Sequence, residues 1–177
     1  MKKYLFPILS LFIITVIVVG LLAFTNQLTE NAIKKIAEEE AQKAMAIVLP
    51  GGAPFEDVTQ KYDLSVFSGP AHVTKISLSE KGYVLTLVTN GYGGKMLVFV
   101  GLDKEGKIVN IMIGDNSETP NLGTEVENEE FTSQFIGLSK DDNLDTRVDN
   151  VARATVSSEA VKVAVKEALD IFKEVIE

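Results

Sequence analysis

A chain of 177 residues is long enough for one folded domain and a small accessory segment. Its 25 acidic and 17 basic residues give a formal net charge of −8, and the basic residues form no dense cluster. This composition argues against nucleic-acid binding, which needs a basic surface. The absence of cysteine excludes disulfides, Cys-ligated iron–sulfur clusters and Cys/His zinc sites. The single histidine, His72, has no nucleophile elbow nearby, so we expect no catalytic or metal-binding role for it.

The first predicted element is an apolar run over residues 4–24, which contains no charged side chain. As a helix it would be roughly 30 Å long, enough to cross the hydrocarbon core of a bilayer. Because Lys2 and Lys3 precede it, the positive-inside rule places the N-terminus in the cytoplasm and the rest of the chain outside. A cleaved signal peptide is the alternative, but the run exceeds a usual h-region and ends without an Ala-x-Ala site. We therefore expect residues 1–28 to be a cytoplasmic tip and a single-pass anchor in the cell (inner) membrane.

Residues 29–177 are expected to form one extracytoplasmic α+β domain. Apolar residues at helical spacing over 29–48 predict a stalk helix, which Pro50-Gly51-Gly52 ends. Runs of apolar and β-branched residues separated by turn residues then predict an antiparallel sheet in meander order. The four predicted strands span residues 73–78, 83–88, 95–102 and 107–113.

Helices are expected to flank this sheet. After a predicted loop over 115–128, residues 128–136 have Phe131 and Phe135 one helical turn apart and predict a short helix.

The last predicted helix is the clearest element, because apolar residues recur on one face from Val161 to Ile176. Ser157 or Ser158 is the expected N-cap, and Glu159 in the first turn would complement the helix dipole.

The stretch from Asp149 to Ser158 places the hydroxyl of Thr155 just before this predicted helix. The first N–H groups of a helix have no intrahelical acceptor and lie at the positive end of its dipole, so they suit a phosphate. A hydroxyl there could contact a phosphate or be esterified to one. A threonine that merely precedes the helix is the alternative.

Three segments together resemble the FMN-binding subunits of the Rnf and Na⁺-pumping NADH:quinone oxidoreductase complexes. The first is Gly91-Tyr92-Gly93-Gly94 with the apolar strand that follows. The second is Glu118-Thr119-Pro120-Asn121-Leu122-Gly123, followed by Gln134-Phe135-Ile136-Gly137. The third is the stretch from Asp149 to Ser158, which matches in part the family's flavinylation motif Asp-x-x-(Ser/Thr)-Gly-Ala-(Ser/Thr). The length and the single anchor are most similar to the Rnf G subunit.

The resemblance implies that FMN is joined through its phosphate to the side chain of Thr155. In the family a separate flavin transferase forms this bond from FAD, releases AMP and recognises the residue that maps onto Asp149. Tyr92 is expected either to stack near the isoalloxazine ring or to pack in the core at a strand edge. The other residues that the resemblance places near the flavin are Glu118, Thr119, Leu122, Gly123, Ala154, Ser157 and Ser158.

The chain departs from the family motifs at three positions. Ala152 stands where the family has Ser or Thr, and Arg153 and Asn121 stand where it has Gly. Asparagine tolerates a left-handed backbone, so Asn121 is a mild change. At Arg153, glycine could be required for a positive φ or for close approach of the flavin or the transferase. Alternatively, the arginine pairs with the FMN phosphate.

The resemblance implies an electron-transfer subunit with covalent FMN and no independent turnover. Its expected partners are the other membrane subunits of an Rnf-type complex, which couples ferredoxin oxidation and NAD⁺ reduction to Na⁺ or H⁺ translocation. A membrane-tethered assembly or ligand-binding module without covalent flavin is one alternative. A carrier that binds FMN non-covalently is another.

Overall fold

The computed structural model describes residues 2–64 and 69–176. Residues 1, 65–68 and 177, which belong to the predicted anchor and domain, lie outside the described part. The chain divides into two compact units, Met1–Ala41 and Gln42–Glu177. The boundary predicted between residues 28 and 29 stays a prediction.

The first unit consists of the greater part of α1 (Lys2–Val48), a continuous helix that includes the predicted stalk over 29–48. Within α1, the 20 residues Pro7–Asn26 have a mean hydropathy of 2.8. Their length and composition are those of a helix that crosses a bilayer once. The structure therefore fits a single-pass membrane protein.

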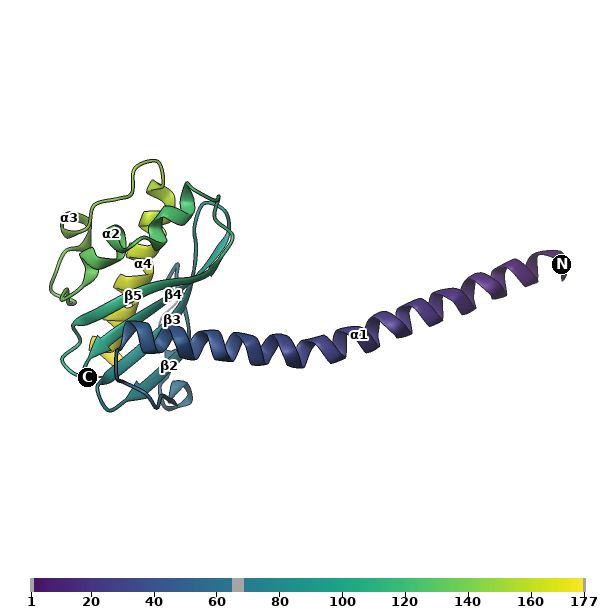
Figure 1. Ribbon diagram of the computed structural model, residues 1–177, viewed down its shortest axis with the longest axis horizontal. Helices are drawn as coiled ribbons and strands as arrows, with labels where there is room; N and C mark the ends of the chain where they lie inside the picture. Colours follow the sequence, from purple (N-terminus) through teal and green to yellow (C-terminus); the bar gives the residue numbers. More distant parts are fainter. Residues whose placement is uncertain (1, 65–68, 177) are drawn as a thin grey trace. The chain divides into compact units, whose positions relative to one another are not determined.

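The second unit is built on a five-stranded antiparallel sheet in the order β1-β2-β3-β4-β5 (Figure 1). Each strand pairs with its neighbour in sequence, so the predicted meander is confirmed. Four strands are the expected ones: β2 (His72–Ser79), β3 (Gly82–Asn90), β4 (Lys95–Asp103) and β5 (Ile108–Asn116). The fifth, β1 (Glu56–Asp57), pairs with the end of β2 and comes from a segment without a clear sequence pattern.

Helices cover both faces of this sheet (Figure 1). The helix α4 (Thr155–Ile171) packs on one face, where it shares a hydrophobic core with alternate residues of β4. The last turns of α1 lie on the other face, where Gly101 of β4 approaches the backbone carbonyl of Val48 so closely that a Cβ atom would overlap it. Asn110 Nδ2 of β5 also donates a hydrogen bond to the Ile47 carbonyl at 3.4 Å. Both faces of β4 are therefore buried.

The segment between the sheet and α4 consists of short helical elements. The predicted helix over 128–136 occurs as α2 (Glu129–Thr132) continued by the 3₁₀ turn η4 (Ser133–Phe135). The rings of Phe131 and Phe135 meet edge to face, with centroids 5.3 Å apart. The predicted loop over 115–128 contains a 3₁₀ helix, η3 (Gly123–Glu127). Further elements within residues 2–64 and 69–176 are η1 (Thr59–Lys61), α3 (Leu144–Arg147) and the π-helical η5 (Phe172–Ile176) after α4.

The start of α4 differs from the sequence prediction. The helix begins at Thr155, and its N-cap is Ala154, which supplies no side-chain hydrogen bond. The prediction that Ser157 or Ser158 caps the helix is therefore wrong, because both lie inside its first turns and are buried. Glu159 lies beyond the first turn, which contains no acidic residue. The predicted apolar face is confirmed by the burial of Val161, Ala164, Val165, Ala168, Leu169 and Phe172.

Candidate functional site

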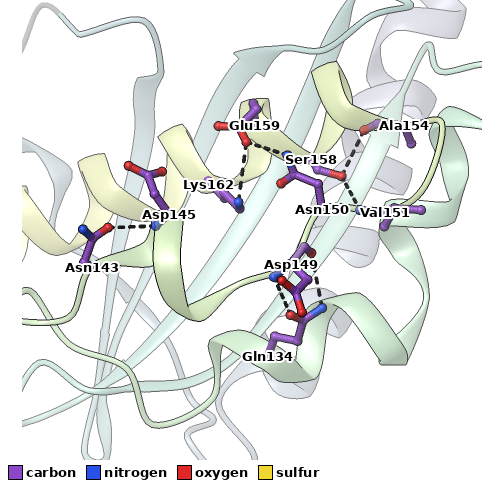
Figure 2. A network of polar contacts seen from close by, with 10 residues as sticks. All are labelled: Gln134, Asn143, Asp145, Asp149, Asn150, Val151, Ala154, Ser158, Glu159 and Lys162. Atoms are coloured by element: carbon purple, nitrogen blue, oxygen red, sulfur yellow. Dashed lines mark hydrogen bonds and ion pairs between the residues drawn. The ribbon is translucent and has the colours of Figure 1, made fainter.

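The loop that leads into α4 is held by hydrogen bonds from two other parts of the domain (Figure 2). The Asp149 N–H donates to Gln134 Oε1 at 2.7 Å, which ties the loop to η4. The Val151 N–H donates to Ser158 Oγ at 3.0 Å, and that hydroxyl donates in turn to the Ala154 carbonyl at 2.9 Å. Ser158 therefore shapes the loop from within α4, and its hydroxyl is already used by the protein.

Glu159 adds a third attachment of this loop (Figure 2). Its Oε1 accepts a hydrogen bond from Asn150 Nδ2 at 2.7 Å and lies 3.5 Å from Lys162 Nζ. The hydrogen bond from Asn150 is the main cause that holds the pKa of Glu159 below its usual value of 4.5. Desolvation opposes this lowering of the pKa, and Lys162 adds to it through its charge and its hydrogen bond.

The variant Asn150→Ala is expected to move the pKa of Glu159 back toward its usual value. A carboxyl whose pKa is lowered by folding stabilises the fold above its unfolded pKa, and this contribution is lost as the pH falls through the folded pKa. The stability difference between wild type and variant should therefore be present at pH 7 and shrink below about pH 4. Urea unfolding at pH 7 and pH 3 measures it.

Asn143→Ala is the matched control for this prediction. Asn143 Oδ1 accepts a hydrogen bond from the Asp145 N–H at 3.0 Å as the N-cap of α3, and neither group titrates. Loss of this capping hydrogen bond should lower the free energy of unfolding by about 1 kcal/mol at both pH values. An equal cost of Asn150→Ala at pH 7 and pH 3 would contradict the role assigned to Glu159.

Two non-glycine residues in the described part of the chain have a left-handed backbone, Asn121 with φ 57° and Arg153 with φ 69°. They are the two positions at which this chain departs from a glycine of the family motifs that it resembles. A left-handed conformation costs roughly 1–2 kcal/mol for an ordinary L-residue and is readily adopted by glycine. Arg153 therefore adopts the positive φ that was one of the reasons considered for glycine at this position, and the other reasons stay predictions.

Arg153→Gly is expected to stabilise the domain by about 0.5–1 kcal/mol, since relief of the left-handed strain exceeds the added freedom of the unfolded chain. Ala152→Gly is the matched control, because Ala152 is also exposed but is not among the residues with positive φ. It should destabilise by about 0.5–1 kcal/mol. Urea unfolding at neutral pH compares the two variants, and a loss of stability in Arg153→Gly would contradict the prediction.

A cavity of about 350 Å³ lies at the start of α4. It is lined by Tyr92, Glu118, Thr119, Leu122, Gly123, Arg153, Ala154, Thr155, Val156 and Ser157. The structure thus brings together residues from all three motif segments, and every predicted site residue except Asp149 and Ser158 lines this cavity. Val156 was not predicted from the sequence. The sign that could have identified it is an apolar side chain that lies outside the buried face of α4.

The two remaining predicted residues lie elsewhere. Asp149 is exposed and lines a neighbouring cavity of about 700 Å³ with residues of η3, α2 and η4. Arg153 lines both cavities and so stands between Asp149 and Thr155. Ser158 is fully buried beneath the loop that it holds.

The entrance of the 350 Å³ cavity combines an accessible hydroxyl with apolar surface. Thr155 is exposed at the first position of α4. Tyr92 is 73% exposed, so the alternative that it packs in the core is wrong. Val156 is 54% exposed and lines the cavity, so it offers apolar surface beside the Thr155 hydroxyl.

These residues fit FMN by the chemistry of its two ends. The N-terminus of α4 has neither a side-chain cap nor an acidic residue in its first turn, and the cation Arg153 directly precedes the cap residue, which suits a phosphate. Tyr92, Leu122 and Val156 offer apolar contacts to a flat ring system.

Comparison with known proteins agrees with this assignment. Residues 91–170 match the model of the FMN-binding domain family, and this range contains every residue that lines the cavity. This segment is therefore similar to FMN-binding domains.

Over most of its length the chain is also similar to the G subunits of ion-translocating complexes. It is 29% identical to the G subunit of the ion-translocating oxidoreductase complex of Methanosarcina acetivorans, over 92% of this chain and 91% of the relative. It is 27% identical to the G subunit of the Na⁺-translocating ferredoxin:NAD⁺ oxidoreductase complex of Acetobacterium woodii, over 93% of this chain and 89% of the relative. The G subunit of the ion-translocating oxidoreductase complex of Shewanella piezotolerans is 27% identical over 88% of this chain and 82% of the relative. The resemblance seen in the three motif segments is confirmed.

Proposed function

We propose that this chain is a membrane-anchored electron-transfer subunit that carries FMN covalently on Thr155. The observation that carries the proposal is the meeting of three separate motif segments in one cavity, around an exposed hydroxyl at an uncapped helix start. The FMN-binding domain that matches residues 91–170 supports the cofactor. The names of the relatives, which are subunits of ion-translocating oxidoreductase complexes, support membership of an Rnf-type complex.

The residues of this chain would bind, orient and shield the cofactor, while the bound FMN supplies the redox chemistry. The first N–H groups of α4 and the guanidinium of Arg153 would bind the phosphate. Tyr92, Leu122 and Val156 would contact the ring system. Because the linkage is covalent, the cofactor would not be lost by dilution outside the membrane.

Attachment would convert the Thr155 hydroxyl into a phosphodiester. The threonine oxygen would form a bond to the FMN-side phosphorus of FAD, the pyrophosphate bond would break, AMP would leave, and the hydroxyl proton would be released. The exposure of Thr155 suits modification by a separate flavin transferase, which would engage the loop at Asp149. Lys2 and Lys3 support a cytoplasmic N-terminus and an extracytoplasmic domain. The electron partners of this domain would be the other membrane subunits of the complex.

The test is co-expression of the full-length chain with and without a flavin transferase. The purified protein is denatured, and the gel band is examined for flavin fluorescence and for a mass gain of FMN less one water. We expect both signals only with the transferase. A native protein that is yellow but has a dark denatured band would indicate non-covalent FMN. A colourless protein that still joins a membrane complex would indicate the assembly or ligand-binding module.

A further inference from the structure

The residue that connects the three motif segments is Glu118. Its side chain is buried, with 7% of the residue exposed. Oε1 accepts a hydrogen bond from the Gly93 N–H at 3.1 Å, and Oε2 accepts one from the Ser157 hydroxyl at 2.8 Å. Both oxygens act as acceptors, as they do in an ionised carboxylate. One side chain thus joins the turn between β3 and β4 to the first turn of α4.

Two glycines make room for this carboxylate. A Cβ atom at Gly91 would overlap Oε1 of Glu118, and a Cβ atom at Gly123 would overlap Oε2. Gly91 belongs to the first motif segment and Gly123 to the second, so the two motifs meet at the same group. The local shape of the site is therefore built around Glu118.

Glu118 also contacts the first turn of α4 through a side chain of that helix. The carboxylate receives the hydroxyl of Ser157, the third residue of α4, and so lies at the positive end of the helix dipole. Its hydrogen bonds are charge-assisted and stronger than those between neutral groups. Within the described residues Glu118 forms no ion pair with lysine or arginine. The site therefore contains a buried negative charge without a basic partner.

We propose that Glu118 is a positioning residue that holds the start of α4, and with it Thr155, against the β3–β4 turn, and that its charge lowers the midpoint potential of the bound flavin. This inference rests on the proposed function of Thr155. Thr155 and Ser157 share one helical turn, so fixing the Ser157 hydroxyl fixes the direction in which Thr155 is presented. Reduction adds electron density to a flavin, and a nearby buried negative charge opposes it.

Four variants separate position from charge. Glu118→Gln keeps the size and hydrogen bonds of the side chain, since its amide can accept from Gly93 and donate to Ser157 Oγ, but removes the charge. Glu118→Ala removes both. Ser157→Ala keeps the charge and removes the connection to α4. Glu127→Gln is the control, because this glutamate in η3 is exposed and accepts a hydrogen bond from Asn116 Nδ2 at 2.8 Å.

The first measurement uses full-length protein co-expressed with a flavin transferase. Flavin per protein and the midpoint potential are determined for each variant. We expect Glu118→Gln to load as wild type does but with a more positive potential. Glu118→Ala and Ser157→Ala should load at least about tenfold less flavin, because a small displacement of a reacting group costs much of its rate. Glu127→Gln should change neither property.

Wild-type loading by Ser157→Ala and by folded Glu118→Ala would overturn the positioning role. A potential of Glu118→Gln equal to that of Glu127→Gln would overturn the role of the charge. If Glu118→Ala does not fold, Ser157→Ala decides the positioning role.

The second measurement is amide hydrogen exchange in the unloaded full-length chain, and it is independent of flavin. The Gly93 amide should exchange at least about tenfold faster in Glu118→Ala than in wild type, and at nearly the wild-type rate in Glu118→Gln. An unchanged rate in Glu118→Ala would overturn the inference. Absence of flavin from the wild-type protein would instead contradict the proposed function, and the exchange rates would still test Glu118.

Discussion

Thr155→Val is expected to abolish flavin attachment to the full-length chain co-expressed with a flavin transferase, whereas Thr155→Ser should retain it. Valine has nearly the shape of threonine but lacks the hydroxyl that would become the ester oxygen. Because Thr155 is exposed, the stability of the domain should change by no more than about 0.5 kcal/mol. Loss of fluorescence from the denatured band would therefore report chemistry and not unfolding.

Thr119→Val is the matched control for this prediction. Thr119 is also an exposed threonine, and it lines the same cavity. It should keep its covalent flavin, which would show that the loss at Thr155 does not follow from removing any hydroxyl near the flavin. Fluorescence that survives in Thr155→Val would contradict the proposed linkage, and peptide mass spectrometry would then locate the modified residue.

The largest expected effect on stability is that of Phe135→Ala, about 3–5 kcal/mol. Phe135 is fully buried, its ring packs against Phe131, and the cavity left by its removal lies within the hydrophobic core. Such a loss is a large part of the stability of a typical domain, about 5–15 kcal/mol. Gln134, the neighbour of Phe135 in η4, holds the Asp149 backbone, so the site loop should loosen as well.

Urea unfolding at neutral pH measures this effect on the full-length chain. Far-UV circular dichroism is a suitable signal, because the chain contains no tryptophan. Ile136→Ala is the matched control, since Ile136 is the next residue and is 51% exposed. It should cost at most about 0.5 kcal/mol. A cost below 1 kcal/mol for Phe135→Ala would contradict the placement of η4 in the core.

The elements that could be predicted are those whose signal lies in consecutive residues. The spacing of apolar residues predicted the strands β2 to β5 and the buried face of α4, because a strand or an amphipathic helix repeats its pattern over many positions. The strand β1 could not be predicted, since its two residues are exposed and are defined only by pairing with β2.

The residues of the site could be predicted, but the hydrogen bonds that join them could not. The order of three motifs identified most of the residues around the cavity, whereas the left-handed backbone of Arg153 was only one of the explanations that the sequence left open. Only the cap role of the two serines was predicted wrongly, because cap preferences are weak and local. The hydroxyl of Ser157 instead binds a carboxylate 39 residues away in sequence.

The sequence by itself therefore determined the apolar N-terminal helix, the meander, the last helix and the likeness to FMN-binding subunits, since each depends on residue type and order. Only the tertiary structure decided where α4 begins, that Tyr92 lies at the surface, and that Glu118 joins the motifs. The physical reason is that a buried carboxylate requires hydrogen-bond donors wherever the fold can supply them. For Glu118 these donors come from Gly93 and Ser157, which only folding brings together.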